Sequence, residues 1–425
     1  TGDNDRYMRL WWEVLSNRIN HAAISDDDAA SSGMRWFPCT KGGNFRKWYG
    51  NKEYIMNWEN RGQRILLDAK AEKRHSQDYY NNLKFQKGVS WSVLTASTRS
   101  FRIEDNNLIE HVGMATFPHK KEQILQVLGF LNSIVAAYYL TFLSPTVAVN
   151  AGEIGRLPLL ECRSENLKID EAVEECIDIS NADWDSFETS WDFKRHPLIQ
   201  NRVLSGWGDN GPLSGRISQS FNMWKMLTDH RFNQLKTSEE ELNRIFIDIY
   251  GLQDELTPEV ENKDVTVRKA DLKRDIKSLI SYAVGCMFGR YSPIKDGLVY
   301  AGNEWDYVKI QDELFSAMGQ NGFQSADGLW DMNIIDKDNI IPICDDEYFE
   351  DDIVCRFVKF IETVYGRETL DENLRFIADA LGGSGQPKDV IRNYFLNDFY
   401  TDHLKIYQKR PIYWLFDSGK KNGFK

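Results

Sequence analysis

The stretches Glu53-Tyr54-Ile55-Met56-Asn57-Trp58 and Val89-Ser90-Trp91-Ser92-Val93-Leu94 decide the fold class of the first part of the chain. Both are short and rich in aromatic and branched residues, which is typical of β-strands. Glycines interrupt the region 31–118 at short intervals and mark turns between such runs, at Gly42-Gly43, Gly50, Gly62 and Gly88. We therefore expect a β-rich domain over these residues.

Helical patterns dominate the rest of the chain. Lys120–Leu143 is expected to form one long helix that closes the β-rich domain, and apolar residues recur at helical spacing after about residue 160. A capping box near Thr237 predicts a helix start there, and the spacing predicts helices over Lys269–Phe288 and Ile353–Tyr365. Two further helices are expected to begin near Thr369 and Pro387.

These patterns predict a mixed α+β fold. The N-terminal, β-rich part ends in a long helix, and a mostly α-helical C-terminal region follows. We expect three domains, over residues 1–160, 161–300 and 301–425, with the glycine-rich segment Gly206–Gly215 as a linker.

Composition excludes several classes of protein. The 425 residues carry a net charge of −12 and are 42% hydrophobic, which excludes a disordered chain and argues against a polytopic membrane protein. Gln123–Gly152 lacks charged residues, but its polar residues and Pro145 favour a helix buried in a protein core over a membrane span. The chain begins with Thr1 and shows no signal peptide, so we interpret it as a fragment of a longer protein.

The six cysteines have no pair at C-x-x-C spacing. This pattern predicts free thiols in a reducing cytoplasm and neither a disulfide framework nor a zinc site.

Positive charge is concentrated near the front of this acidic chain. Residues 31–121 contain 16 basic and 8 acidic residues, interleaved with aromatic ones, as in Phe45-Arg46-Lys47-Trp48-Tyr49. Such a block suggests a face for a polyanion, because Arg and Lys bind phosphates and Arg also reads guanine. The alternative is a β-rich domain with rings in its core and ordinary cations on its surface, and composition alone slightly favours that alternative.

Known catalytic motifs are missing from the sequence. There is no Gly-rich phosphate loop, nucleophile elbow or H-E-x-x-H, and no histidines at metal-ligand spacing. Asp26-Asp27-Asp28 and the acidic runs before Ile353 are best interpreted as helix caps or solvated loops. Asp68-Ala69-Lys70, with Glu59 upstream, resembles a nuclease pattern, but an exposed helix is the better interpretation.

Ordered blocks of residues resemble a known family. In the N-terminal half they are Thr1–Val14, Lys47–Tyr54, Asn57–Asn60, Ser90–Ser92, Leu128–Ser133 and Ser144–Thr146. In the C-terminal half they are Ala182–Asp185, Phe187–Trp191, Tyr282–Tyr291, Gln386–Lys409 and Arg410–Phe416. Together these blocks resemble the PglX family, the adenine-specific DNA methyltransferases of BREX phage-defence systems, which are similar to type IIG restriction-modification enzymes.

The resemblance implies adenine-N6 methylation with S-adenosylmethionine and a role in target recognition. The sequence departs from the family at one important point, because neither the Asn-Pro-Pro-Tyr motif nor the F-x-G-x-G cofactor motif occurs. We therefore expect no catalytic, cofactor-binding or metal-binding residue in this chain. The implied partners are double-stranded DNA, the methyltransferase half and other BREX subunits, with no membrane.

The candidate DNA contacts lie in the basic block. We expect phosphate or base-edge contacts from Arg35, Lys41, Arg46, Lys47, Lys87, Arg99 and Arg102. Asn57 and Ser97 are candidate base-edge readers, whereas Trp48 and Trp58 are expected in the core. Two other hypotheses stay open: a scaffold that docks defence-system subunits and touches DNA little, and a stand-alone enzyme of unrecognised chemistry.

Overall fold

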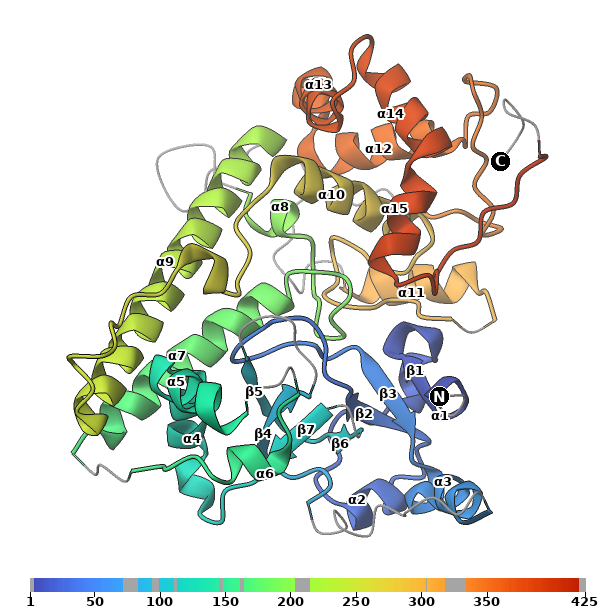
Figure 1. Ribbon diagram of the computed structural model, residues 1–425. Coiled ribbons are helices and arrows are strands. Elements are labelled where there is room, and N and C mark those ends of the chain that lie inside the picture. The colour runs from blue at the N-terminus through green and yellow to red at the C-terminus, as the bar shows by residue number, and fades with distance from the viewer. Residues whose placement is uncertain are drawn as a thin grey trace. The chain divides into compact units, whose positions relative to one another are not determined.

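The computed structural model describes residues 4–71, 83–93, 99–110, 113–144, 148–160, 164–202, 215–302, 304–317 and 334–419 (Figure 1). The chain divides into two compact units. Unit 1 contains residues 1–184 and 230–268, and unit 2 contains residues 185–229 and 269–425. This division differs from the expected boundaries near residues 160 and 300, because α7 (Asn166–Trp184) packs against α4 (Ile124–Asn132) inside unit 1.

A four-stranded sheet forms the first part of unit 1, in the order β1-β3-β2-β6. Its strands are β1 (Met8–Leu10), β2 (Trp36–Thr40), β3 (Tyr54–Asn57) and β6 (Leu108–Ile109). β3 pairs antiparallel with both β1 and β2, so that Met56 lies opposite Met8 and Phe37, whereas β6 runs parallel to β2. The strand expected over Glu53–Trp58 is thus confirmed as β3.

A second sheet of unit 1 has the order β5-β4-β7, with β4 (Gly88–Ser92) between β5 (Phe101–Glu104) and β7 (Gly113–Thr116). Both pairings are antiparallel. Because side chains alternate along a strand, Trp91 and Phe101 point into the hydrophobic core, while Ser90 and Arg102 share the other face. The second strand expected from the sequence is thus confirmed as β4.

Unit 1 also contains helices before, between and after its strands. They are α1 (Asn4–Tyr7), α2 (Asp26–Ser31), α3 (Glu59–Ala71) and α6 (Ala151–Ile154). The Ser25 hydroxyl caps α2 by accepting a hydrogen bond from the Asp28 N–H, and the three aspartates form the first helical turn. This arrangement confirms the interpretation of Asp26-Asp27-Asp28 as a helix start.

The long helix expected over Lys120–Leu143 is broken into α4 and α5 (Ile134–Leu143). Ser133 adopts an extended conformation and its hydroxyl caps α5, and the two segments bend by 72° at this break. Within the described residues, no single helix is long and apolar enough to cross a membrane, and only this bent pair passes the same test when taken together. Leu128 and Val135 are fully buried in the core of unit 1.

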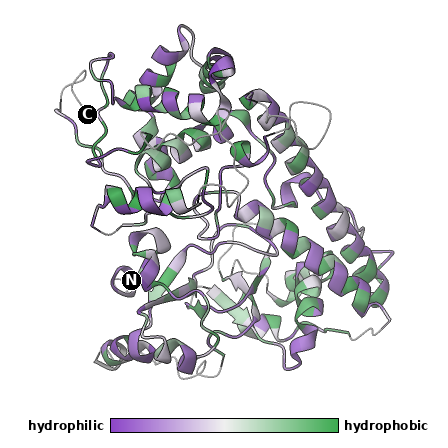
Figure 2. Ribbon diagram, turned by 180° about the vertical axis from the view of Figure 1, so that it is seen from behind, coloured by the Kyte–Doolittle hydropathy of each residue, from purple (hydrophilic) through white to green (hydrophobic). Residues whose placement is uncertain are grey.

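One long helix replaces the helix start expected near Thr237. α9 (Ile217–Tyr250) continues through Thr237 without interruption, and the division between the two units falls within it. Hydrophobic residues alternate with hydrophilic ones along α9 (Figure 2), and Leu242 and Phe246 lie in the core of unit 1. The apolar residues of α9 recur at helical spacing on both sides of Thr237, and this pattern favours one continuous helix over a helix start at the capping box.

Unit 2 is a helical assembly around one hydrophobic core. Its helices are α8 (Pro197–Gln200), α10 (Leu272–Met287), α11 (Tyr307–Ala317), α12 (Ile353–Tyr365), α13 (Leu370–Leu381), α14 (Pro387–Asn397) and α15 (Phe399–Ile406). The Asp352 carboxylate caps α12 by accepting hydrogen bonds from Val354 and Cys355 N–H groups. The chain is 52% helical and 9% strand, which confirms the α+β class. The expected linker lies almost wholly outside the described residues.

Candidate nucleic-acid interface

The predicted DNA contacts separate into exposed or half-buried residues at the ends of the strands and buried residues inside unit 1. Lys41 directly follows β2, and Arg99 precedes β5 by two residues. The Gly43 N–H donates a hydrogen bond of 2.9 Å to the Ser92 hydroxyl at the end of β4. Because β4 and β5 are antiparallel, the end of β4 lies beside the start of β5. Lys41 and Arg99 therefore belong to the same end of the two sheets.

Arg35 and Lys87 belong to the opposite end, because they directly precede β2 and β4. Both side chains are exposed. The Asp26 carboxylate holds this end together by accepting hydrogen bonds from Trp58 Nε1 at 2.7 Å and from Lys84 Nζ at 3.2 Å. The guanidinium of Arg35 lies 5.6 Å from the ring of Trp36.

The four cations at the strand ends differ in their surroundings. Lys41 is half-buried with its Nζ 4.3 Å from the centre of the Tyr54 ring. Arg99 is half-buried, and its Nη2 lies 3.4 Å from the Ser144 carbonyl oxygen. Lys87 and Arg35 are the more exposed pair, and Arg35 lies 4.0 Å from Glu59 in a solvent-exposed ion pair. Because an exposed ion pair of this kind is weak, Arg35 can exchange Glu59 for a phosphate.

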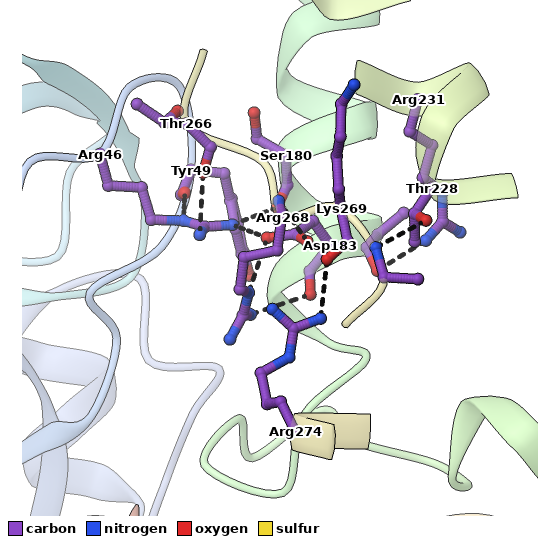
Figure 3. Close-up of polar contacts among 12 residues, drawn as sticks. Arg46, Tyr49, Ser180, Asp183, Thr228, Arg231, Thr266, Arg268, Lys269 and Arg274 are labelled. Atoms are coloured by element: carbon purple, nitrogen blue, oxygen red, sulfur yellow. Dashed lines mark hydrogen bonds and ion pairs between the residues drawn. The ribbon is translucent and has the colours of Figure 1, made fainter. Parts of the chain in front are cut away.

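Arg46, by contrast, is enclosed within unit 1 (Figure 3). Its Nη2 donates to the Asp183 carboxylate at 2.8 Å and to the Ser180 carbonyl at 3.0 Å, both on α7. Its Nε donates to the Tyr49 carbonyl at 2.8 Å. Gly50 permits this approach with a φ of +124°, because a Cβ there would overlap the Arg46 side chain.

Asp183 receives a second cation, since Arg268 Nε lies 3.4 Å from the same carboxylate oxygen (Figure 3). Burial alone would raise the pKa of Asp183, but Arg268 and Arg46 lower it below its usual value. A buried carboxylate with two guanidinium partners holds its charge, so the three residues form a structural ion cluster.

Lys47 is also enclosed, against α9. Its Nζ lies 2.7 Å from Glu239 Oε2, and Trp48 Nε1 donates to the other oxygen of the same carboxylate at 2.7 Å. The Thr266 hydroxyl accepts a hydrogen bond from the Lys47 N–H at 3.2 Å. Both oxygens of Glu239 are therefore occupied by side chains of the basic block.

Arg102 is fully buried on the polar face of the second sheet, where its Nη1 donates to the Arg46 carbonyl at 3.1 Å. Burial lowers the pKa of its guanidinium, an effect that Glu104 partly offsets. Burial removes Arg46, Lys47 and Arg102 from the predicted DNA surface, because each is held by interior partners. Residue type and position predicted DNA contacts for these three cations, whereas the structure places them in the interior.

The structure also describes the positions of most of the remaining predicted residues. Asn57 is buried, and its side-chain oxygen accepts a hydrogen bond from the Glu59 N–H at 3.3 Å, so its position disfavours base reading. Ser97 lies outside the described residues. Trp48 and Trp58 are buried, as expected for core residues. The structure adds Arg64 to the candidate DNA contacts, because it is exposed on α3. The sequence signal that could have predicted its exposure is the helical spacing of this segment.

Catalytic chemistry finds little support in the side chains that the structure describes. Asp68, the candidate nuclease carboxylate, lies 2.9 Å from Arg6 and accepts a hydrogen bond from the Tyr7 hydroxyl. Within the described ranges, no group of three or more His, Cys, Asp or Glu residues is arranged to hold a metal ion. The exposed cations at the strand ends can bind an anion.

Comparison with known proteins places the whole chain beside two curated methyltransferases. No family model matches it. It is 42% identical over 434 residues to "Adenine-specific methyltransferase PglX" of Lacticaseibacillus casei (strain Zhang) and 33% identical over 450 residues to "Adenine-specific methyltransferase BrxX" of Escherichia coli O9:H4 (strain HS). Both alignments cover 100% of this chain but only 33% and 34% of the relatives, so the chain spans about a third of their length.

Proposed function

Because this chain belongs to the PglX-type family of BREX adenine-specific methyltransferases, of which it spans about a third, we propose that it is the DNA-reading part of such an enzyme. Binding of S-adenosylmethionine and methyl transfer then fall to the part of the enzyme that carries the motifs missing from these 425 residues. Other BREX subunits are its proposed partners, and the cytoplasm is its proposed compartment.

One observation carries this proposal: cations occupy both ends of the paired sheets in a chain whose net charge is −12. Arg35 and Lys87 at one end are exposed, and Lys41 and Arg99 at the other end are half-buried. Arg35 and Lys41 flank β2, and six residue steps at about 3.3 Å each separate them by roughly 20 Å. The major groove of B-DNA is about 12 Å wide. Cations at this separation can therefore contact phosphates on either side of one groove.

Phosphate contacts of this kind would position the duplex and not read its sequence. The target adenine has to leave the base stack for methylation, at a cost of a few kcal/mol. By holding the backbone on both sides of the groove, the strand-end cations would keep the duplex in register while the base is extruded. Arg35 and Arg99 can also donate to guanine, which gives them a direct route to sequence reading.

Duplex binding by the whole chain tests the proposal. We expect the variant Arg35→Gln/Lys41→Gln/Lys87→Gln/Arg99→Gln to lose about 10-fold or more in duplex affinity at low salt, and to show a smaller dependence on salt. Fluorescence anisotropy with a labelled duplex at several salt concentrations measures both.

A matched variant separates local contact from net charge. Arg156→Gln/Lys168→Gln/Arg244→Gln/Lys263→Gln removes the same four charges from exposed positions of unit 1 that lie outside the two sheets. It should keep nearly the affinity of the unmodified chain. If the two variants bind the duplex equally, or if the unmodified chain shows no salt-dependent binding, the proposed interface is incorrect.

A further inference from the structure

A large apolar groove opens on the surface of unit 2. Its volume is about 440 Å³, within the range of pockets that bind ligands or side chains. Its lining includes Val284 of α10, Phe288 directly after α10, and Phe395 and Phe399 around the junction of α14 and α15. Segments 339–343 and 413–418 complete the lining. None of these residues belongs to the DNA-reading surface proposed above.

Segment 413–418 is anchored at its start and exposes two aromatic side chains. Tyr413 stacks on Phe288 with ring centres 4.7 Å apart, and the Ile412 N–H donates to His403 Nε2 at 3.2 Å. Inward and outward positions then alternate, so that Trp414 and Phe416 are 72% and 81% exposed. In segment 339–343 of the lining, Ile340 is 68% exposed. Large apolar side chains held outward beside a pocket mark an interaction site.

An acidic loop borders the same groove. Residues 344–352 include six acidic residues and no basic residue. Both Ile343 and Ile353 line the groove, and the Ile353 N–H donates to the Pro342 carbonyl at 2.9 Å, which closes the base of the loop between them. The acidic loop therefore begins and ends beside the groove.

Some of these carboxylates are used within unit 2, and others face solvent. Asp352 pairs with Arg392, and Glu347 lies 3.4 Å from Lys388. Asp345, Asp346 and Glu350 are exposed, and among the residues that the structure describes no ion pair is recorded for their side chains. Their charge is available to a partner in solution.

We propose that this groove binds a basic segment of a partner protein, with apolar side chains in the pocket and Lys or Arg against the acidic loop. Charge complementarity selects this occupant, since opposite potentials favour encounter and like charges oppose it. The acidic loop disfavours nucleic acid, because both are negatively charged. A second copy of this chain is disfavoured because it would bring two acidic loops together. An amphipathic helix with apolar residues on one face fits a groove of this kind.

The test uses a labelled amphipathic peptide of Leu and Lys, compared with the same peptide carrying Glu in place of Lys. We expect only the Lys peptide to bind the whole chain. The variant Trp414→Ser/Phe416→Ser should weaken that binding about 10-fold or more, because exposed aromatic anchors dominate such interfaces. Fluorescence anisotropy reports binding, and thermal unfolding verifies that the variant is folded.

A charge-matched pair of variants locates the contact. Asp345→Asn/Asp346→Asn/Glu350→Gln should weaken Lys-peptide binding at low salt by about 10-fold. Glu171→Gln/Glu174→Gln/Asp178→Asn removes the same charge from the exposed side of α7 and should change binding less than about twofold.

Several outcomes would overturn the proposal. They are equal binding of both peptides, equal weakening by the two charge variants, or no binding of the Lys peptide at all. A dimer detected by light scattering and dissociated by Phe416→Ser would instead identify a second copy as the occupant. Because none of these results depends on duplex binding, the groove and the DNA-reading proposal can fail separately.

Discussion

Two sets of cations in unit 1 have the same residue types but opposite roles. The inner set, Arg46, Lys47 and Arg102, lies inside and binds protein groups. The outer set lies at the strand ends, where Arg35 and Lys87 face solvent and Lys41 and Arg99 are half-buried. A buried charge is costly unless it is paired and hydrogen-bonded. The inner set therefore joins the sheet region of unit 1 to α7 and α9. Of the two sets, the outer one is available to a polyanion.

The largest expected effect comes from stranding a buried charge. Lys47→Met removes the cation from the buried Glu239 carboxylate, which among the residues that the structure describes then keeps the Trp48 Nε1 donor. We expect the free energy of unfolding to fall by about 3–5 kcal/mol. Chemical denaturation measures this loss.

Two further variants check the cause of that loss. Lys47→Met/Glu239→Gln should recover most of the stability, because the neutral amide still accepts from Trp48 and no charge is stranded. Lys87→Met, in the outer set, should change stability by less than about 0.5 kcal/mol. If Lys87→Met lowers the free energy of unfolding as much as Lys47→Met does, the distinction between the two sets is incorrect.

Unit 2 offers a buried carboxylate to compare with Asp183. Glu188 accepts hydrogen bonds from Tyr407 at 2.9 Å and Ser281 at 3.0 Å. Burial raises the pKa of Glu188 to about 7, against the lowering effect of those hydrogen bonds. Because the folded state holds this proton more tightly than the unfolded state, Glu188 should make the protein less stable as pH rises from about 4.5 to about 7.

Glu188→Gln should remove this pH dependence while keeping the hydrogen-bond acceptor. Relative to the unmodified chain, the variant should gain up to about 3 kcal/mol between pH 4.5 and pH 8. Urea denaturation across that range measures the difference, with exposed Glu171→Gln as the control. Parallel pH profiles for Glu188→Gln and the unmodified chain would show that burial does not raise this pKa.

Single substitutions in the outer set should affect DNA more than stability. Arg35→Gln or Lys87→Gln should each reduce the slope of log affinity against log salt by about 0.9 if the side chain contacts one phosphate. Duplex titrations at several salt concentrations measure the slope. An unchanged slope for both variants would assign the two residues to ordinary solvated surface.

The smallest expected effect concerns an outer cation with a partial structural role. Lys41→Met removes the contact of Nζ with the Tyr54 ring and should lower the free energy of unfolding by about 0.5 kcal/mol. Lys87→Met provides the baseline, since its side chain is exposed. If Lys41→Met is as stable as Lys87→Met, the ring contact contributes nothing measurable.

Local sequence predicted β3, β4 and several helices, because their signals lie within a few residues. The two strands follow from aromatic and branched residues between glycine turns, and the end of α12 follows from Gly366. The break at Ser133 was missed, because the apolar run continues on both sides of it.

The inner and outer cations could not be separated from the sequence. Arg46 and Lys47 sit in the densest basic and aromatic stretch, and nothing nearby distinguishes them from surface residues. Their partners Asp183 and Glu239 lie 137 and 192 residues further along the chain. Burial of this kind is a property of the tertiary fold, and a local pattern cannot report it.

Lysine acetylation read by mass spectrometry, with and without a DNA duplex, compares the two sets in one experiment. Lys41 and Lys87 should react in the free chain and become protected by the duplex, while Lys47 should react slowly in both states because Glu239 and the protein interior enclose it. If Lys47 instead reacts as fast as Lys87 and is protected by the duplex, the cations assigned to the interior are DNA contacts, and the division between the two sets is incorrect.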